Sequence, residues 1–468
     1  GSRTSNDAAI NSVAVLPLSN QIGDPQLEYL PDGITESLID GLSQLPDLTV
    51  RPASMVLAYK GNEIDPVRAG EALKVDAVVS GQILREGERL IVEIRLLRTK
   101  NGVMLWSQKY EGRPAGILAV QEEISHELAN SLRTRSGDNE KSRTAKSPTQ
   151  NSEAYRLYTI GRTLWLKRSS DSTLKAIELF LQAIKLDNNY ALAYVGLADA
   201  YSTLGSYSQG PPYEVYPKAR EAAEQALKLD GQMAEAHASL GKILTDFDWD
   251  WASAEREFKH ALALTPNYPN APHWYSSLLA AEGRIDEAIR EVKIAQGLDF
   301  LSPATNTQVG SVLYRARRYN EAIASLKETL ELEPNFVPAR IYLGFCYRRL
   351  NRFDDALAEF QRGRQIAPNA PESVGLLSST YAAKGELNEA RRYLAELQEI
   401  SKHRYVSPGS FIGIYAAMGK SDKAFEWIEK GFLEGSPTIR GLRTDPMYDP
   451  LRQDPRFAGL LRRAGLAP

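Results

Sequence analysis

The chain has 468 residues, of which 43% are hydrophobic and 25% are charged, and its formal net charge is −3. A chain of this length exceeds the roughly 100–200 residues of one domain, so we expect at least two cooperative units or a repeat array. The near-neutral charge excludes a global field that drives binding to nucleic acid or anionic lipid, and no apolar stretch approaches the roughly 18 residues that span a bilayer. Because the chain starts with Gly1 and Ser2 rather than Met, we expect it to be a piece of a longer protein.

Residues 12–133 switch between strand and helix periods. The apolar run at 13–16 predicts a buried strand, and the apolar residues at spacings of three and four in 27–45 predict a helix. Glycine-containing turns at 86–87 and 101–102 predict two hairpins, because glycine tolerates the positive φ of tight turns. The predicted order is β-α-β-α-β-β-β-α, a small α/β domain, with the remaining elements at 48–51, 65–74, 76–85, 88–98, 103–110 and 117–132.

Residues 134–152 are almost all polar or charged and predict a solvated linker. Beyond the linker the pattern is helical throughout, and residues 153–436 repeat with a period of 34. The clearest markers of the period are eight alanines. The first two are 43 residues apart, and each later interval is 35 or 34 residues. The longer first interval indicates an inserted loop near 205–213. The eight alanines are Ala176, Ala219, Ala254, Ala288, Ala322, Ala356, Ala390 and Ala424.

The spacing around these alanines predicts helical hairpins. Small residues such as Gly310 and Gly344 stand twelve residues before an alanine, and bulky apolar residues such as Phe360 stand four after it. Small residues let two helix backbones approach, and the bulky ones fill the space beside them. On these residues the segment resembles the tetratricopeptide repeat family, which implies an all-α superhelical solenoid of about eight repeats. The first, second and eighth repeats depart from the pattern, with Ala198 and Ile412 where glycine is usual. Residues 437–468 predict a helical cap on the last hairpin.

No constellation of catalytic or metal-binding residues is found in the sequence, so we expect no enzyme activity, no cofactor and no metal. The five histidines form no triad or HExxH signature, and Gly419-Lys420-Ser421 lacks the leading glycine and the strand of a phosphate loop. Asp246, Asp248 and Asp250 alternate as calcium ligands do, but the glycine and the terminal glutamate of that loop are absent.

The chemistry that remains is a binding surface. In a hairpin solenoid the first helix of each repeat lines the concave side, and large aromatic and arginine side chains there are typical interface anchors. We expect a protein or peptide partner in this groove, and a solvated basic face is the alternative for any single arginine. The predicted partner-binding residues are Arg162, Trp165, His273, Ser277, Tyr314, Arg315, Phe345, Arg348 and Arg349.

The strings SVAVLPLSN, VDAVVSGQILREGERLIVEIRLL and GVMLWSQKY, together with Asp32-Gly33-Ile34-Thr35-Glu36, resemble the TolB-amino-terminal-like domain, also compared with FlgO-type domains. In bacterial signalling proteins that domain stands before tetratricopeptide repeats, downstream of a kinase, a winged-helix domain or a nucleotide cyclase. For Asp32, Thr35 and Glu36 a structural role is also available, which is to cap and charge the first turn of a helix.

The tandem implies a non-enzymatic interaction and sensor region of a bacterial signalling protein. Our first expectation is the extracytoplasmic part of a receptor-like serine/threonine kinase, although no kinase motif occurs in this chain. The alternative is the cytoplasmic effector half of a winged-helix regulator or a nucleotide cyclase. We expect the amino-terminal domain either to dock across the repeats or to form a homodimer, with no nucleic acid bound and no membrane span in this chain.

Overall fold

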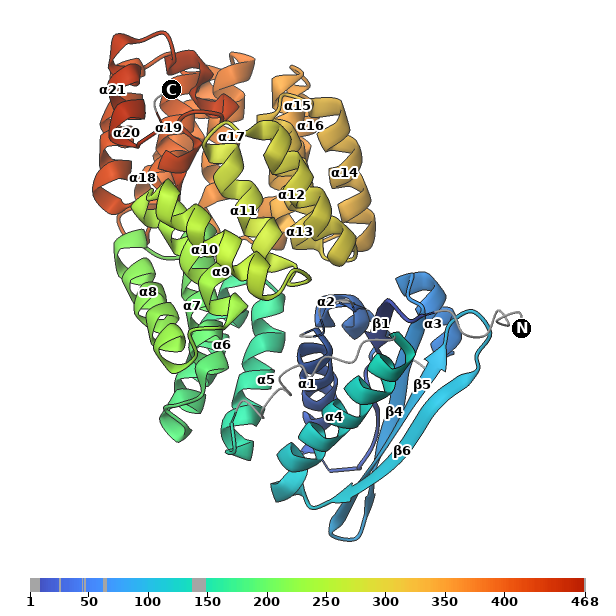
Figure 1. Cartoon of the computed structure of the whole chain (residues 1–468). Coiled ribbons are helices and arrows are strands. Elements are labelled where there is room, and N and C mark those ends of the chain that lie inside the picture. Colours follow the sequence, from blue (N-terminus) through green and yellow to red (C-terminus); the bar gives the residue numbers. More distant parts are fainter. Residues whose placement is uncertain are drawn as a thin grey trace. The chain divides into compact units, whose positions relative to one another are not determined.

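The computed structural model describes residues 9–24, 27–43, 45, 48–61, 65–136 and 149–466 (Figure 1). The chain forms two compact units, of which one comprises residues 1–197, 225–232 and 262–268 and the other the remaining residues. Most of the predicted linker lies outside the described residues, since the preceding helix runs to Ser136 and the first repeat helix starts at Ser152. The first unit contains the α/β domain and the first helical hairpin.

The α/β domain is built on one mixed sheet with strand order β3-β1-β4-β5-β6, in which β2 also pairs with β4. Strands β1, β2 and β3 lie parallel to their neighbours, and β4, β5 and β6 form the two predicted antiparallel hairpins. Short elements at β2 and α2 were not predicted. The bounds are β1 Ser12–Val15, β2 Ser19–Gln21, α1 Leu30–Ser43, β3 Thr49–Val50, α2 Ala53–Val56, η2 Leu57–Tyr59, α3 Pro66–Leu73, β4 Ala77–Glu86, β5 Arg89–Arg98, β6 Met104–Gly112, η3 Pro114–Gly116 and α4 Ile117–Ser136.

One face of this sheet is buried, as the alternation in the sequence predicts. Leu90, Val92, Ile94 and Leu96 of β5 are at most 1% exposed, whereas Arg95 points to the other face and is exposed. Helices α1 and α4 contact each other, and α4 also contacts β6, so these helices cover the apolar face.

Eight helix pairs follow, one for each predicted repeat, and the two helices contact each other in the first repeat and in the fourth to the eighth (Figure 1). The pairs are α5 Ser152–Leu166 with α6 Ser170–Leu186, α7 Ala191–Ser206 with α8 Pro212–Leu229, α9 Ala234–Ile243 (continued by η4 Leu244–Asp248) with α10 Trp251–Leu264, α11 Asn270–Ala281 with α12 Ile285–Leu298, α13 Pro303–Arg315 with α14 Tyr319–Leu332, α15 Val337–Arg349 with α16 Phe353–Ile366, α17 Pro371–Lys384 with α18 Leu387–Ile400, and α19 Pro408–Ala417 with α20 Ser421–Glu434.

The register of the repeats agrees with the alanine period, because all eight marker alanines are 0% exposed. A methyl group added at Gly344 would lie 2.5 Å from Cε1 of Phe360, and one at Gly310 would lie 2.5 Å from Cγ of Leu326. Glycine is thus required where the two helices of a repeat cross. Ala198, which stands where glycine is usual in the second repeat, is 0% exposed, and Gly196 two residues earlier lies against Phe180 of the first repeat.

After α20 the chain continues through η5 Pro437–Gly441, η6 Pro446–Leu451 and α21 Pro455–Arg463. We call residues 436–466 the C-terminal segment. Leu451 and Phe457 are at most 2% exposed, and η5 and η6 contact α20 and α19, so the segment covers the last hairpin as predicted. Among the described residues, no helix is long and apolar enough to cross a membrane.

Candidate interaction surface

The first helices of successive repeats contact one another in the second unit, from α9 through α11 and α13 to α15. They form one continuous surface, which we call the inner face. Seven predicted binding residues lie in α11, α13 and α15, and Arg349 is the last residue of α15.

Part of the inner face is occupied by the C-terminal segment. Arg315 donates a hydrogen bond to Oγ1 of Thr444 at 2.9 Å, and its guanidinium lies 3.6 Å from the carboxylate of Asp445. Arg349 donates to the backbone carbonyl of Pro446. Two of the three predicted arginines on the inner face therefore hold the chain's own residues.

The fourth repeat takes part in the same contact. Thr444 Oγ1 donates to the carbonyl of Ala280 at 2.8 Å, at the end of α11. The neighbouring turn contains Gly283 with φ +82°, and a methyl group there would lie 2.9 Å from Nε of Arg443. The turn is glycine both because of its left-handed backbone and because the C-terminal segment packs against it.

A second ion pair fixes η6 to the fifth repeat. Arg317 binds both carboxylate oxygens of Asp449, with 2.7 Å between Nη2 and Oδ1, and Arg452 donates to the same carboxylate at 2.9 Å. Burial acts to raise the pKa of Asp449, but the hydrogen bonds from Arg317 and Arg452 outweigh it and hold the pKa below its usual range. Sequence analysis missed Arg317, which follows the predicted Arg315 by two residues.

The strongest link to the third repeat is a buried carboxylate. Asp246 is 1% exposed and contacts Arg440 of the C-terminal segment, Lys242 and Oγ of Ser206, the last at 2.9 Å. Burial acts to raise the pKa of Asp246, but the charges of Arg440 and Lys242 lower it to about 2.

The three alternating aspartates that resemble a calcium loop, Asp246, Asp248 and Asp250, each have a protein partner. Asp248 pairs with Arg220, and Asp250 accepts a hydrogen bond from the backbone of Ser253 at 3.1 Å at the start of α10. No group of three or more metal-ligating side chains occurs among the described residues. The neighbouring Trp251 donates to the carbonyl of Ala464 at 2.9 Å, which ties the end of the C-terminal segment to the third repeat as well.

The predicted aromatic anchors of the inner face are largely buried. Tyr314 is 1% exposed and stacks on Phe345 with 5.7 Å between ring centroids. Arg348 lies 5.4 Å from the Phe345 ring and donates to Oγ of Ser379 at 2.9 Å, and burial lowers the pKa of its guanidinium. Our expectation that Tyr314 is exposed is wrong, because it fills the space between α13 and α15.

His273 and Ser277 lie further along the inner face. His273 is half-buried, with Nδ1 at 3.4 Å from Oγ1 of Thr305, and Ser277 accepts a hydrogen bond from Gln308 at 2.8 Å. These contacts join adjacent repeats.

Arg162 and Trp165 belong to the first unit and are not part of the inner face of the second. Trp165 is 1% exposed, with the guanidinium groups of Arg162 and Arg168 over its ring at 4.6 and 3.6 Å. The expected exposure of Trp165 is therefore wrong. Two of the nine predicted residues thus lie in α5 of the first unit, and the other seven lie in α11, α13 and α15 of the second.

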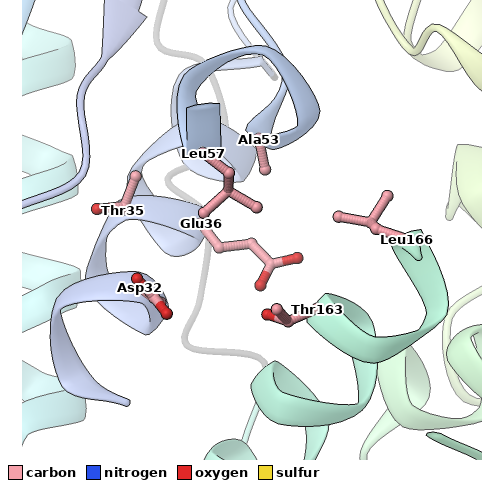
Figure 2. A pocket seen from close by; sticks show the side chains of 7 residues that line it. All are labelled: Asp32, Thr35, Glu36, Ala53, Leu57, Thr163 and Leu166. Carbon is pink, nitrogen blue, oxygen red and sulfur yellow. The ribbon is translucent and has the colours of Figure 1, made fainter. Parts of the chain in front are cut away.

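The first unit has a small pocket between α1, α2, η2 and α5 (Figure 2). The carboxylate of Glu36 points across it toward the helix that carries Thr163, and its Oε1 lies 3.7 Å from Nε of Arg162. Burial raises the pKa of Glu36, although the charge of Arg162 opposes the shift. The free space is about 10 Å³, enough for one water molecule rather than an organic ligand.

Three residues of α1, namely Asp32, Thr35 and Glu36, were predicted to cap and charge the first turn of a helix, and for two of them the structure shows other contacts. Asp32 does lie in the first helical turn, where its carboxylate pairs with Lys60 at 2.5 Å. Thr35, however, donates to the carbonyl of Pro31 at 2.7 Å, and Glu36 faces Arg162. Neither caps the helix.

Two family models match parts of the chain. Residues 9–127 match the second domain of HilA/YgeH-like transcriptional regulators, and residues 313–379 match the tetratricopeptide repeat. Neither covers half of the chain. The resemblance of the amino-terminal domain to the TolB-amino-terminal-like family is not supported by these matches and stays a prediction.

Curated relatives match longer stretches at low identity. Putative adenylate cyclase 3 of Rhizobium meliloti is 28% identical over 251 residues, which cover 53% of this chain and 42% of that protein. The transcriptional regulator HilA of Salmonella typhimurium is 24% identical over 296 residues, which cover 62% of this chain and 51% of that protein. The chain thus spans about half the length of these relatives.

Solved structures of similar proteins include human IFIT1 bound to PPP-AAAA, with a TM-score of 0.47, 16% identity, and coverage of 68% of this chain and 82% of that one. PilF of Pseudomonas aeruginosa has a TM-score of 0.35 and 18% identity, and covers 52% of this chain and 98% of that one. At these scores the likenesses carry no inference about function. The chain is thus similar in sequence to a putative adenylate cyclase and to a transcriptional regulator, and it contains tetratricopeptide repeats, a protein-interaction scaffold.

Proposed function

We propose that this chain is the non-catalytic regulatory half of a bacterial signalling protein, which binds a protein partner through its repeats and controls an output domain elsewhere in the full-length protein. The observation that carries the proposal is that a putative cyclase and a transcriptional regulator both match this chain. The two matched lengths together exceed the length of the chain, so both relatives share part of it. A segment common to proteins with different outputs suits regulation rather than either output reaction.

This proposal follows our alternative expectation, the effector half of a winged-helix regulator or a nucleotide cyclase. Neither relative reported above is a kinase, so nothing favours the extracytoplasmic part of a receptor-like kinase over it.

The contacts of the C-terminal segment support a partner site on another part of the inner face. Arg315 and Arg349 are engaged by Thr444 and Pro446, so these two side chains already hold the chain's own residues. Within this proposal the partner contacts inner-face residues other than Arg315 and Arg349, with Arg348 and Ser277 as the central positions. Both residues are half-buried, and each is hydrogen-bonded to a residue of the next repeat, Arg348 to Ser379 and Ser277 to Gln308.

Two experiments test this proposal, an assay of ATP turnover and a photocrosslinking assay of partner binding. Purified chain with labelled ATP should form no cyclic nucleotide and transfer no phosphate, and sustained turnover would contradict a regulatory half. In cells that naturally make the protein, crosslinking from a photoreactive residue at position 277 should capture one partner saturably. A matched probe at the exposed Arg391 of α18 should not capture it. Equal capture from both positions would contradict binding on the inner face.

A further inference from the structure

The outer strand of the α/β sheet has one side without a strand beside it. Among the strands that the structure describes, β6 pairs with β5 alone, and it lies at the margin of the sheet (Figure 1). An edge strand presents a row of backbone N–H and C=O groups that a further strand can pair with.

The exposed edge is long and regular. From Trp106 to Gly112 the pairing with β5 is continuous, and the one register shift lies near Leu96 and Leu97, opposite the start of β6. No proline interrupts the strand. Natural edges are usually short, rich in lysine or broken by proline, and this one has a single lysine.

The charges on β6 fit a second copy of the same strand. Lys109 and Glu111 stand two residues apart on the face opposite the buried Tyr110. In an antiparallel pair centred on Tyr110, each Lys109 lies opposite Glu111 of the second copy, so the two-fold axis generates two opposite-charge pairs. A pair centred on Lys109 would oppose two lysines, and one centred on Gln108 would place Lys109 opposite Ser107 and form no ion pair.

We propose that two copies of this chain associate through antiparallel β6 strands in the register centred on Tyr110, in which residues 108–112 of one copy lie opposite residues 112–108 of the other. In this register each even-numbered residue of β6 lies opposite an even-numbered residue of the second copy. The side chains that share a face with Tyr110 therefore lie on the same side of both sheets, and the two apolar faces form one continuous face. A symmetric pair also suits the proposed function, because DNA-binding regulators commonly match two-fold symmetric sites as dimers.

The experiment is sedimentation equilibrium of the whole chain and a charge-swap series. The wild-type chain should dimerise, more weakly as salt is raised. Lys109→Glu replaces both ion pairs by like-charge pairs and should raise the dimer dissociation constant by about tenfold. Lys109→Glu with Glu111→Lys should restore it to within about threefold of wild type, since the exposed pair between Glu111 and Arg89 is a minor loss. Arg68→Glu on α3, an exposed charge away from the edge, is the matched control.

A wild-type chain that stays monomeric at every concentration up to its solubility limit would overturn the proposal. A dimer that Lys109→Glu does not weaken, or that the double substitution does not restore, would also overturn it. Each measurement uses this chain alone, so its failure leaves partner binding by the repeats unaffected.

Discussion

Asp246 shows how a single buried residue attaches the C-terminal segment to the third repeat. It is 1% exposed and has two cationic partners, Lys242 and Arg440, the second of which stands 194 residues later in the chain. An ionised carboxylate is stable at such a site only while it is paired.

The lowered pKa of Asp246 predicts an acid-dependent loss of stability. Its pKa is about 2 in the folded chain and 3.8 for an unperturbed carboxyl group, so the stabilisation is fully present above pH 4 and is lost as the pH falls toward 2. The shift corresponds to about 2 kcal/mol. The difference in the free energy of unfolding between wild type and Asp246→Asn, measured by urea at several pH values, should therefore shrink below pH 4. A difference independent of pH would contradict the pairing.

Removing the cation from the other side of this pair should be costly. Arg440→Ala leaves Asp246 with Lys242 alone and should lower the free energy of unfolding by about 3 kcal/mol, as for other broken buried ion pairs. Arg456→Ala, which removes an exposed pair with Asp454 in the same segment, should change it little. Equal effects of the two substitutions in urea titrations would contradict the burial of Asp246.

At the scale of elements, the crossing of the two helices in a repeat tolerates no added volume. Ala356 at the crossing of α15 and α16 is 0% exposed, so Ala356→Leu should overpack it and destabilise the array by about 1–3 kcal/mol. Ala383→Leu on the exposed side of α17 is the matched control and should leave the thermal transition nearly unchanged. A wild-type melting temperature for Ala356→Leu would show that the repeat register is wrong.

The contacts of η6 and its preceding loop give a second element-scale prediction. Arg315→Glu with Arg349→Glu places two carboxylates beside Asp445 and the Pro446 carbonyl, so the melting temperature should fall and proteases should cut residues 442–449 sooner. Arg362→Glu with Arg391→Glu on exposed outer positions makes the same charge change and should have no such effect. If both double variants melt alike, these arginines do not hold the segment. Charge reversal here therefore tests stability, where the sequence had suggested partner capture alone.

At the scale of the whole molecule, the features that repeat could be predicted from sequence and those that occur once could not. The burial of the eight alanines follows from a local periodicity, since each hairpin packs its apolar stripe against its neighbours. The two β-hairpins follow from Gly87 and Gly102, which have φ of 64° and 67°.

The course of the C-terminal segment is different in kind. Arg315 and Thr444 are 129 residues apart, and nothing periodic links them. Arginine and aromatic residues on an inner face have the same composition whether they hold a partner or the chain's own terminus, so the sequence pattern found the arginines but not their occupant. The predicted exposure of Tyr314 is wrong for a related reason. A side chain at a surface position of one helix becomes buried when a neighbouring repeat covers it.

Hydrogen–deuterium exchange of the intact chain tests most directly whether the C-terminal segment is a permanent part of the inner face. We predict that amides of 442–451, which include the fully buried Leu442 and Tyr448, exchange as slowly as those of α13 and α15, against which the segment packs. Exchange of this segment at the rate of an unstructured peptide, with α13 and α15 still protected, would contradict that conclusion and reopen the groove at repeats five and six to a partner.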